Sequence, residues 1–241
     1  MPEIDAKKFY NEIMPTKQGE DYEHARWHSS AIAEVGYEQT KQTIDAFLTA
    51  HSSVSSILEL GPGAGTWSKR IRAKYPQAKM TLVDISKEML GRAKKVLGTE
   101  NVTYIESAFE DFQTQERFDF FLSSRVIEYI DEKDVFAQKL FEVLEPGAKG
   151  LIITKLPHYT RMKMQGKKVS ALHTGQITPE HLIEILQKVG FSVVKVRPVT
   201  VSVPLCKSAM LNTIAGNILR NFSPNILTAT CIESYAVEIT K

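Results

Sequence analysis

The sequence predicts an α/β fold built on a mostly parallel sheet. Two observations lead to this prediction. Short apolar runs alternate along the chain with segments of helical periodicity, which is the order of βαβ units with right-handed crossovers. The first of these runs also ends in a glycine-rich turn that opens a helix, an arrangement that receives a ligand at the carboxyl ends of parallel strands. We expect seven strands with helices on both faces and the last strand antiparallel.

The strands follow from the apolar runs and the helices from residues that recur at helical spacing. We expect strands at 54–60, 79–84, 102–106, 118–123, 149–155, 191–198 and 234–240. We expect helices at 66–75, 86–97 and 131–144, and another with Thr178 as its cap, Pro179 at its first position and Gly190 after its end. The expected core stripes of the last three helices are Met89, Leu90, Ala93, Val96 and Leu97; Val135, Phe136, Leu140 and Leu144; and Leu182, Ile185, Leu186 and Val189.

Two regions flank or interrupt this alternation. Residues 1–50 are polar and mostly helical in pattern, with Tyr37, Ile44, Phe47 and Leu48 on one face, and could form a lid. Residues 51–241 would form the main domain, with 156–177 and 200–230 as insertions on the substrate side.

The second insertion contains an amphipathic helix at 205–222. Its apolar face is Leu211, Ile214, Ala215, Ile218, Leu219 and Phe222. We expect this face to pack on the core. The alternatives are a wall of an apolar pocket, a dimer contact or shallow membrane association, and the few cations on its polar face argue against the last.

Composition places the chain among ordinary globular proteins. The chain has 241 residues, of which 43% are hydrophobic and 24% charged. No apolar run approaches the ~20 residues of a membrane span, and the N-terminus lacks the pattern of a signal peptide. The two cysteines, Cys206 and Cys231, have no metal-binding spacing. We therefore expect a cytoplasmic protein without a metal, either a monomer or a homodimer.

Charge is unevenly distributed along the chain. Between Pro146 and Pro179 there are six basic residues and no acidic one: Lys149, Lys155, Arg161, Lys163, Lys167 and Lys168. This segment could be a solvated loop, or it could attract an anionic group of a substrate.

The glycine-rich turn carries the chemistry that the sequence shows most clearly. Residues 57–68 read ILELGPGAGTWS, with Gly61, Gly63 and Gly65 at alternate positions. Glycines let the backbone approach a ligand more closely than a Cβ would allow. A dinucleotide-binding motif, G-x-G-x-x-G, would need its third glycine at Thr66.

Four further segments follow in a recognisable order. TLVDIS at 81–86 ends the second strand with Asp84, which is placed to accept hydrogen bonds from ribose hydroxyls, although an interaction at the following helix N-terminus is an alternative. ESAFEDF follows the third strand and FDFFLSSRVIEYI contains the fourth, before FEVLEPGAKGLII. Together, across roughly 54–155, these segments resemble the class I S-adenosylmethionine-dependent methyltransferases, in the broad group that acts on small molecules. That resemblance implies a Rossmann-like fold and S-adenosyl-L-methionine as the cofactor.

The resemblance also implies roles for residues at matching positions. Gly61, Gly63 and Gly65 would approach the methionine part of the cofactor, with Glu59 near its amino group, although Glu59 could instead bond loop amides. Asp84, with Ile85 beside it, would hold the ribose. Ser107, Ala108 and Phe109 would flank the adenine, with Ser107 replacing the acid that is commonest there. Ser123 and Arg125 would border the sulfonium, although Arg125 could be a surface residue paired with a carboxylate.

No catalytic base stands out in the sequence. A sulfonium is already a strong methyl donor, so positioning of the acceptor could supply much of the acceleration. An oxygen or carbon acceptor would still profit from a base, for which His158, Tyr159, His173 and Glu128 are the candidates. Tyr22, Trp27 and His28 could contact the substrate from the N-terminal segment, and Arg161 and Lys163 could do so from the basic segment.

We expect a small organic acceptor, anionic near the basic segment and partly apolar near 205–222. Nucleic acid is not expected, because no interleaved basic and aromatic pattern is present, and neither is stable membrane insertion. Two other functions stay open. The chain could be a non-catalytic S-adenosylmethionine-binding module, or an NAD(P)-dependent oxidoreductase, against which Thr66 and the Glu145-Pro146-Gly147 turn argue.

Overall fold

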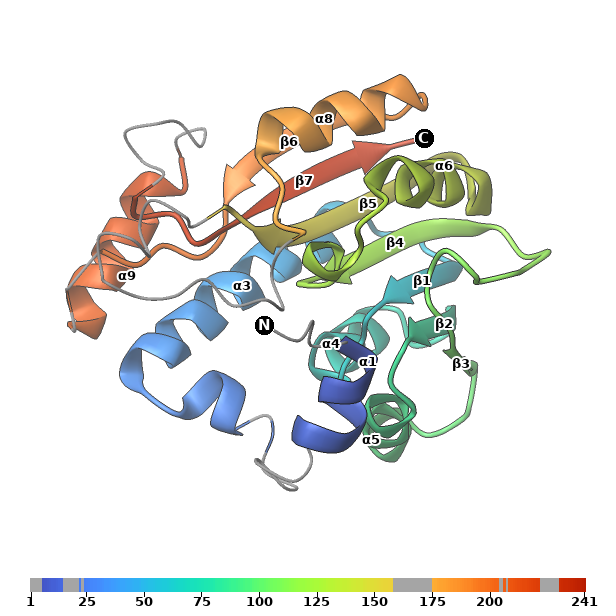
Figure 1. Ribbon diagram of the computed structural model, residues 1–241, viewed down its shortest axis with the longest axis horizontal. Coiled ribbons are helices and arrows are strands. Elements are labelled where there is room, and N and C mark those ends of the chain that lie inside the picture. Colours follow the sequence, from blue (N-terminus) through green and yellow to red (C-terminus); the bar gives the residue numbers. More distant parts are fainter. Residues whose placement is uncertain are drawn as a thin grey trace.

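The computed structural model describes residues 6–14, 22, 24–157, 175–203, 206, 208–221 and 230–241. Its centre is one sheet of seven strands in the order β3-β2-β1-β4-β5-β7-β6 (Figure 1). The strands are β1 (Ser56–Leu60), β2 (Lys79–Asp84), β3 (Val102–Glu106), β4 (Phe118–Ser124), β5 (Leu144–Lys155), β6 (Ser192–Pro198) and β7 (Ser234–Thr240).

Only the last of these strands runs against the others. β7 pairs antiparallel with both β5 and β6, and the remaining neighbours pair in parallel. The predicted α/β fold class, with an antiparallel last strand, is therefore confirmed. The central strands are nearly continuous apolar runs because helices cover both faces of a parallel sheet. In β4, for example, six of the seven residues are buried and Asp119 is half-buried.

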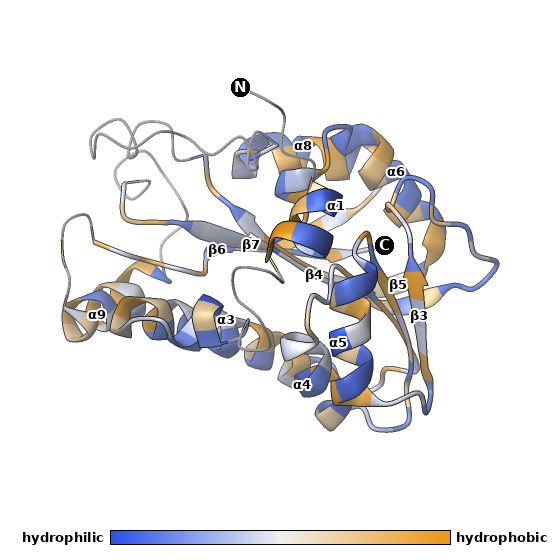
Figure 2. Ribbon diagram, turned by 60° about the horizontal axis from the view of Figure 1, so that its bottom comes forward, coloured by the Kyte–Doolittle hydropathy of each residue, from blue (hydrophilic) through white to orange (hydrophobic). Residues whose placement is uncertain are grey.

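The helices form two layers around the sheet. The long ones are α3 (Ala31–Ala50), α4 (Thr66–Lys74), α5 (Lys87–Leu97), α6 (Lys133–Val143), α8 (Pro179–Lys188) and α9 (Ala209–Leu219). One layer contains α9, α3, α4 and α5 in succession, and the other contains α6 and α8 (Figure 2). Each layer buries its own apolar core against one face of the sheet.

Short side chains begin four of these helices as caps. The hydroxyl oxygens of Ser30, Ser86, Thr178 and Ser208 each accept a hydrogen bond from the backbone N–H three residues later. Such a cap satisfies one of the donors that a helix leaves free at its start. The predicted cap at Thr178, with Pro179 at the first helical position, is confirmed.

Short helical segments precede α3 and pack on the helices α3 and α5. They are α1 (Ala6–Lys8), η1 (Phe9–Ile13) and η3 (His24–His28), and a further one, η4 (Ile127–Tyr129), follows β4. Asn11 fastens η1 to α5, because its Oδ1 accepts hydrogen bonds from Ser86 Oγ at 2.9 Å and Glu88 N at 3.3 Å. The helical N-terminal extension is thus confirmed. Its division from the rest as a separate unit stays a prediction.

Several predicted boundaries and core residues were wrong. β1 begins at Ser56 rather than 54, α6 spans Lys133–Val143, and β5 begins five residues earlier than predicted, at Leu144. Val96 and Val135 are 51% and 46% exposed. Each lies beside the buried stripe of its helix, where apolar periodicity alone does not separate the edge of a face from its centre.

The largest error concerns α9. The predicted core residues Leu211, Ile214 and Ile218 are exposed, whereas Asn212 and Gly216 are buried. The helix faces α3 through a polar contact and a close approach, since a Cβ on Gly216 would lie 2.1 Å from Gln39 Nε2. Ala215 and Leu219 are partly buried as predicted, and Phe222 lies outside the described residues. Among the residues that the structure describes, no helix combines the length and apolar character needed to cross a membrane.

Candidate functional site

A cavity of about 330 Å³ opens at the carboxyl ends of β1, β2 and β4. The strand order reverses between β1 and β4, which is where open parallel sheets bind ligands. The lining comes from the sheet edge, from the turns after β3 and β4 and from the N-terminal segment. It consists of Ala6, Tyr10, Tyr22, Arg26, Leu60, Gly61, Gly63, Val83, Asp84, Ile85, Met89, Ser107, Ala108, Phe109, Glu110, Ser124, Arg125, Val126, Tyr129, Ile130, Asp131 and Glu132.

The glycine turn forms the floor of this cavity. Gly61 has a φ of +67°, and a Cβ there would lie 2.1 Å from Val126 Cγ2. Gly63 has a φ of +56°, yet a Cβ on it would meet no protein atom within 4 Å. Gly61 is therefore required by the fold of the turn. Gly63 keeps open a space that a ligand can fill.

Asp84 ends β2 at the cavity wall and is only 9% exposed. Its Oδ2 accepts a hydrogen bond from Gly63 N at 3.3 Å, and its Oδ1 accepts one from Ser86 N at 2.9 Å. Burial raises the pKa of Asp84 to about 6, although the backbone donors oppose that shift. The two expected positions of Asp84 are therefore compatible. It interacts with the N-terminus of α5 and also lines the cavity.

Three predicted cofactor residues do not line the cavity. Gly65 packs its backbone against Ala93, 3.2 Å from where its Cβ would lie, and Ser123 is fully buried while its neighbour Ser124 lines the wall instead. In a strand, successive side chains point to opposite faces, so an error of one residue changes the face.

Glu59 is the third, buried at 1% exposure. Its Oε2 has no hydrogen-bond partner among the described residues. Burial, together with the nearby Asp84 carboxyl, raises the pKa of Glu59 to about 8. Bonding of this oxygen to the loop amides, the alternative role, is not found. Its place near the cofactor's amino group stays a prediction.

The turn after β3 supplies another wall. Ser107, Ala108 and Phe109 line the cavity, as expected of an adenine-binding region, and Ile85, which follows Asp84 at the end of β2, lines it as well. Ser107 Oγ donates to the carbonyl oxygen of Ala108 at 2.7 Å. The Phe109 ring is buried and stacks on Phe112, with 6.1 Å between the ring centroids.

Arg125 and Glu128 form an ion pair at the end of β4. Arg125 lines the cavity with a φ of +67°, and its Nε donates to Glu128 Oε1 at 2.8 Å. Burial alone would raise the pKa of Glu128, but the Arg125 guanidinium and the Thr154 hydroxyl hold it below its ordinary value. Glu128 does not line the cavity. Such a carboxylate is a poor base, so its position disfavours the catalytic role considered above.

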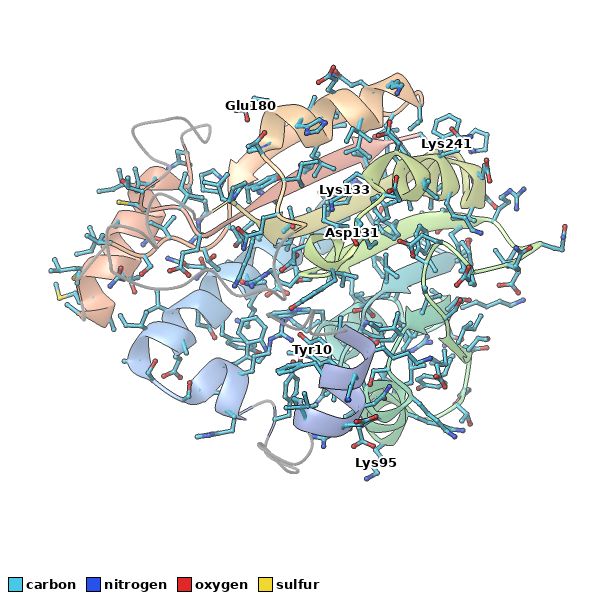
Figure 3. The ribbon with its side chains drawn as sticks, in the orientation of Figure 1. Tyr10, Lys95, Asp131, Lys133, Glu180 and Lys241 are labelled. Atoms are coloured by element: carbon cyan, nitrogen blue, oxygen red, sulfur yellow. The ribbon has the colours of Figure 1, made fainter. Side chains whose placement is uncertain are left out.

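The N-terminal segment closes the cavity with side chains that the sequence alone did not single out. Tyr10 and Arg26 line it together with the predicted Tyr22; Figure 3 shows Tyr10 projecting from the N-terminal helix beside the strand ends. Tyr10 Oη lies 3.1 Å from Tyr129 Oη, and Arg26 Nη1 donates to Tyr22 Oη at 2.5 Å. One sequence feature could have identified Arg26 as a lining residue: it lies between Tyr22 and Trp27 in the segment that was expected to form a lid.

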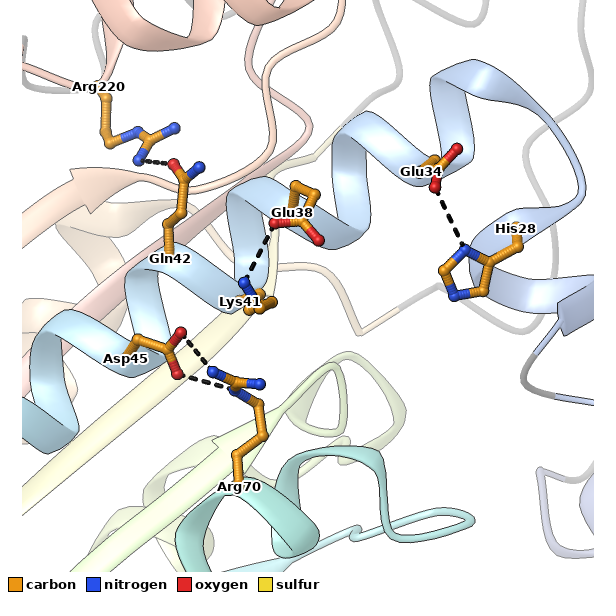
Figure 4. Close-up of polar contacts among 8 residues, drawn as sticks. All are labelled: His28, Glu34, Glu38, Lys41, Gln42, Asp45, Arg70 and Arg220. Carbon is orange, nitrogen blue, oxygen red and sulfur yellow. Dashed lines mark hydrogen bonds and ion pairs between the residues drawn. The ribbon is translucent and has the colours of Figure 1, made fainter. Parts of the chain in front are cut away.

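Trp27 and His28 point elsewhere. Trp27 is buried against Trp67, with 5.5 Å between ring centroids. His28 is exposed and its Nδ1 lies 3.8 Å from Glu34 Oε1 (Figure 4). Neither lines the cavity, so their contact with a substrate stays a prediction that the lining does not support. Three residues separate Tyr22 from Arg26, one helical turn, whereas Trp27 and His28 fall on other faces.

Other candidates lie outside the described residues: His158, Tyr159, His173, Arg161 and Lys163. From the same basic segment, Lys149 Nζ donates to Thr240 Oγ1 at 3.1 Å, far from the cavity lining. Lys155 is half-buried at the end of β5, and burial with the nearby Arg125 guanidinium lowers its pKa to about 8.

The lining suits an amino-acid-bearing nucleoside. Asp84 offers carboxylate oxygens for hydroxyl groups, the turn after β3 offers apolar surface for a base, and Gly63 leaves room beside the backbone. Ser124 Oγ is buried and has no hydrogen-bond partner among the described residues, so a donor or acceptor remains available in the wall. S-adenosylmethionine fits this set of groups.

Comparison with known families decides the class. Residues 57–147 match the family model described as a methyltransferase domain. This chain carries a class I methyltransferase domain. The match contains the glycine turn, Asp84 and the turn after β3, and it ends just after β5 begins. The predicted S-adenosylmethionine-dependent methyltransferase class and its cofactor are thus confirmed at the level of the domain.

Individual relatives extend this comparison. The chain is 32% identical over 108 residues to malonyl-acyl-carrier-protein O-methyltransferase 2 of Ilyobacter polytropus, covering 44% of this chain and 41% of that protein. It is 23% identical over 134 residues to trans-aconitate 2-methyltransferase of an Enterobacter species, covering 55% and 52% of the two chains. The chain thus spans less than half the length of the curated relatives it matches first.

A solved structure covers nearly the whole chain. The N-methyltransferase NodS of Bradyrhizobium japonicum, in complex with S-adenosyl-L-homocysteine, superposes with a TM-score of 0.64 over 96% of this chain and 98% of its own, at 16% identity. At that identity the likeness concerns the fold. It includes the regions outside the family match.

Proposed function

We propose that this chain transfers a methyl group from S-adenosylmethionine to a carboxylate oxygen of a small or carrier-bound organic acid, giving a methyl ester. The observation that carries the proposal is Arg26. Its guanidinium lines the cavity, where its hydrogen-bond partner is the Tyr22 hydroxyl, and no carboxylate of the described residues pairs with it. A cation held in a cavity without a counter-charge is a site for an anionic ligand group.

Arg125 supports the same proposal. Its Nε is engaged by Glu128, and no other hydrogen bond from its side chain is found among the described residues. Its terminal nitrogens remain available, and a planar guanidinium binds a carboxylate through two parallel hydrogen bonds. The relatives named above for malonyl-acyl-carrier-protein and trans-aconitate methylation are in keeping with an acid as acceptor.

A carboxylate acceptor also explains why no base is needed. When bound, S-adenosylmethionine supplies an electrophilic methyl group on a sulfonium. An acid is ionised at neutral pH and already presents a nucleophilic oxygen, so the task of the protein is to place it. Arg26 and Arg125 would orient the acid, while Tyr10, Tyr22 and Tyr129 would shield the site from water.

The proposal can be tested by transfer from S-adenosylmethionine with a deuterated methyl group. The full chain is incubated with a malonyl thioester or trans-aconitate, and the product is examined by mass spectrometry before and after mild alkali. We expect a labelled product whose label alkali releases as methanol, because esters hydrolyse and N-methyl groups do not. Label stable to alkali, or no transfer to any acid tested, would refute carboxylate methylation.

Replacing Arg26 shows whether it binds the carboxylate of the acceptor or the carboxylate of the cofactor. Arg26→Gln should lower kcat/KM at least about tenfold, since hydrogen bonds to charged groups contribute roughly 1.5–3 kcal/mol. A raised KM for the acid alone assigns Arg26 to the acceptor; a raised KM for S-adenosylmethionine alone assigns it to the cofactor's carboxylate. The matched control is Arg117→Gln, at an exposed position after the β3 turn. Unchanged kinetics in Arg26→Gln would remove the observation on which the proposal stands.

A further inference from the structure

The ion pair behind the cavity wall has a role that neither the family match nor the proposed function assigns. We propose that Glu128 is a positioning residue, which holds the Arg125 guanidinium in the orientation that receives the acceptor's carboxylate. This inference rests on the carboxylate-methylating function proposed above. Glu128 acts through Arg125 and does not itself line the cavity.

The first argument is the backbone of Arg125. Its φ of +67° is left-handed, and Asn101 is the other non-glycine residue with positive φ among the described residues. A residue with a Cβ stays in this conformation only where its surroundings enforce it, and such positions concentrate at functional sites. Here the backbone N–H of Arg125 donates to Ile153 O at 2.8 Å, which fixes the turn to the end of β5.

The second argument is how completely Glu128 is held. Its side chain is fully buried. Oε1 accepts from Arg125 Nε at 2.8 Å, and Oε2 accepts from Thr154 Oγ1 at 3.0 Å. Thr154 is itself fully buried in β5. Each carboxylate oxygen therefore has a partner, and the carboxylate plane cannot rotate without losing one of them.

The third argument is the packing of the Glu128 backbone. Gly175, where the described chain resumes, approaches so closely that a Cβ on it would lie 2.7 Å from Glu128 O and 3.0 Å from Ile130 O. Tyr129, the next residue, has its hydroxyl 3.1 Å from that of Tyr10 in the N-terminal segment. The η4 turn is thereby fixed on both sides, and Glu128 can transmit that rigidity to Arg125.

The ion pair leaves the two terminal nitrogens of the Arg125 guanidinium available for a ligand. Only Nε is used by Glu128, so the two terminal nitrogens can form the parallel pair of hydrogen bonds that a carboxylate accepts. A guanidinium without the Glu128 carboxylate would sample several rotamers. It would then offer the acceptor a geometry that is correct only part of the time.

The test compares Glu128→Gln with the wild-type chain, using a malonyl thioester as the probe. Glutamine keeps the size of the side chain and removes its charge. We expect KM for the thioester to rise at least tenfold, with little change in KM for S-adenosylmethionine. Thr154→Val, which removes one hydrogen bond to Oε2, should change the same constant in the same direction by less. The matched control Glu142→Gln, at an exposed position of α6, should change neither.

A second measurement does not depend on turnover. The Nε–H signal of Arg125 in nuclear magnetic resonance, assigned by its absence from Arg125→Lys, should exchange with solvent at least tenfold faster in Glu128→Gln. Unchanged exchange, or equal losses for both substrates, would overturn the positioning role. If the wild-type chain fails to methylate the thioester while Glu128→Gln still frees the Arg125 signal, the proposed function fails and the positioning of Arg125 stands. If Glu128→Gln does not fold, Thr154→Val decides through the same two readouts.

Discussion

Glu59 and Asp84 are two buried carboxyl groups at the ends of β1 and β2, near the glycine turn. Both have pKa values raised by burial, Glu59 to about 8 and Asp84 to about 6. Each therefore binds its proton more tightly in the folded than in the unfolded chain, so its ionisation destabilises the fold. Burial of such groups near a ligand site is typical of positions retained for binding rather than stability.

Glu59→Gln should reveal this effect as a pH-dependent gain in stability. For the wild-type chain, ionisation of Glu59 lowers the free energy of unfolding as pH rises from about 4.5 to about 8, at roughly 1.4 kcal/mol per unit of pKa shift. The variant lacks this loss. Urea unfolding without ligand should thus show a larger advantage of the variant at pH 8 than at pH 5. An advantage that is equal at both pH values would show that Glu59 is not perturbed.

Gly61 should be irreplaceable for a reason separate from its backbone angle. Gly61→Ala combines left-handed strain with a Cβ 2.1 Å from Val126 Cγ2, whereas Gly147→Ala has φ of +84° and open space. The strain alone costs roughly 1–2 kcal/mol. We expect Gly147→Ala to lose about that much in urea unfolding and Gly61→Ala to lose more.

Val126→Ala in the Gly61→Ala background should recover part of the additional loss by removing the clashing methyl groups. Equal losses in the two single variants would mean that the contact with Val126 does not constrain the turn.

At this scale the sequence predicted residue types better than side-chain directions. Gly61 and Gly63 of the glycine turn, Asp84 and the turn after β3 were located from motif spacing and the family resemblance, and they line the cavity. Ser123 was chosen where Ser124 lines the wall, because spacing in a strand does not show which face is free. Arg26 was missed because its importance comes from the return of a helix far away in sequence over the strand ends.

Among the elements, α9 departs most from expectation. Its polar residue Asn212 is fully buried, with Oδ1 accepting from Val203 N at 2.6 Å and Nδ2 donating to Cys206 O and Ser208 O. Gln39 of α3 accepts from Val201 N at 2.9 Å nearby. Gln39 Nε2 also donates to Asn212 O at 3.5 Å, which joins α9 directly to α3. The amphipathic pattern of α9 predicted the opposite face because hydrophobic periodicity cannot register a satisfied buried amide.

Substitutions on the buried polar face of α9 should therefore lower stability more than substitutions on its exposed apolar face. Asn212→Ala should destabilise the chain by about 1–3 kcal/mol, since it removes three hydrogen bonds of a buried side chain and leaves the part-buried backbone N–H of Val203 without its acceptor. Ile214→Gln, at a position 43% exposed, should change stability by less than about 0.5 kcal/mol. Thermal unfolding of both variants measures this. A larger loss for Ile214→Gln would mean that the apolar face is the buried one.

The helix α3 joins its neighbours α4 and α9 within one layer of helices. Asp45 forms a two-point ion pair with Arg70 of α4, at 2.8 and 2.5 Å, and Gln42 accepts from Arg220 just after α9 (Figure 4). The predicted face of α3 is confirmed, with Ile44, Phe47 and Leu48 buried and Tyr37 partly buried. Its polar attachments were not predicted, since they join residues far apart in sequence.

For the whole molecule, the topology explains why one cavity gathers residues from so many segments. The reversal of strand order between β1 and β4 brings the carboxyl ends of three strands together, and the N-terminal segment covers them. The fold class was predictable because alternating strands and helices allow few topologies. The class of acceptor was not predictable from the sequence. Arg26 and Tyr10 come close to Tyr129 only because the N-terminal segment folds over the strand ends.

The most direct test of the account is calorimetric titration of the full chain with S-adenosylmethionine, for the wild type and for Asp84→Ala. We predict saturable micromolar binding by the wild type. Asp84→Ala should weaken it by at least about tenfold, since charged hydrogen bonds to ligand hydroxyls are worth roughly 1.5–3 kcal/mol. No saturable heat at several temperatures, or equal affinities for the two proteins, would contradict the assignment of this cavity to the cofactor.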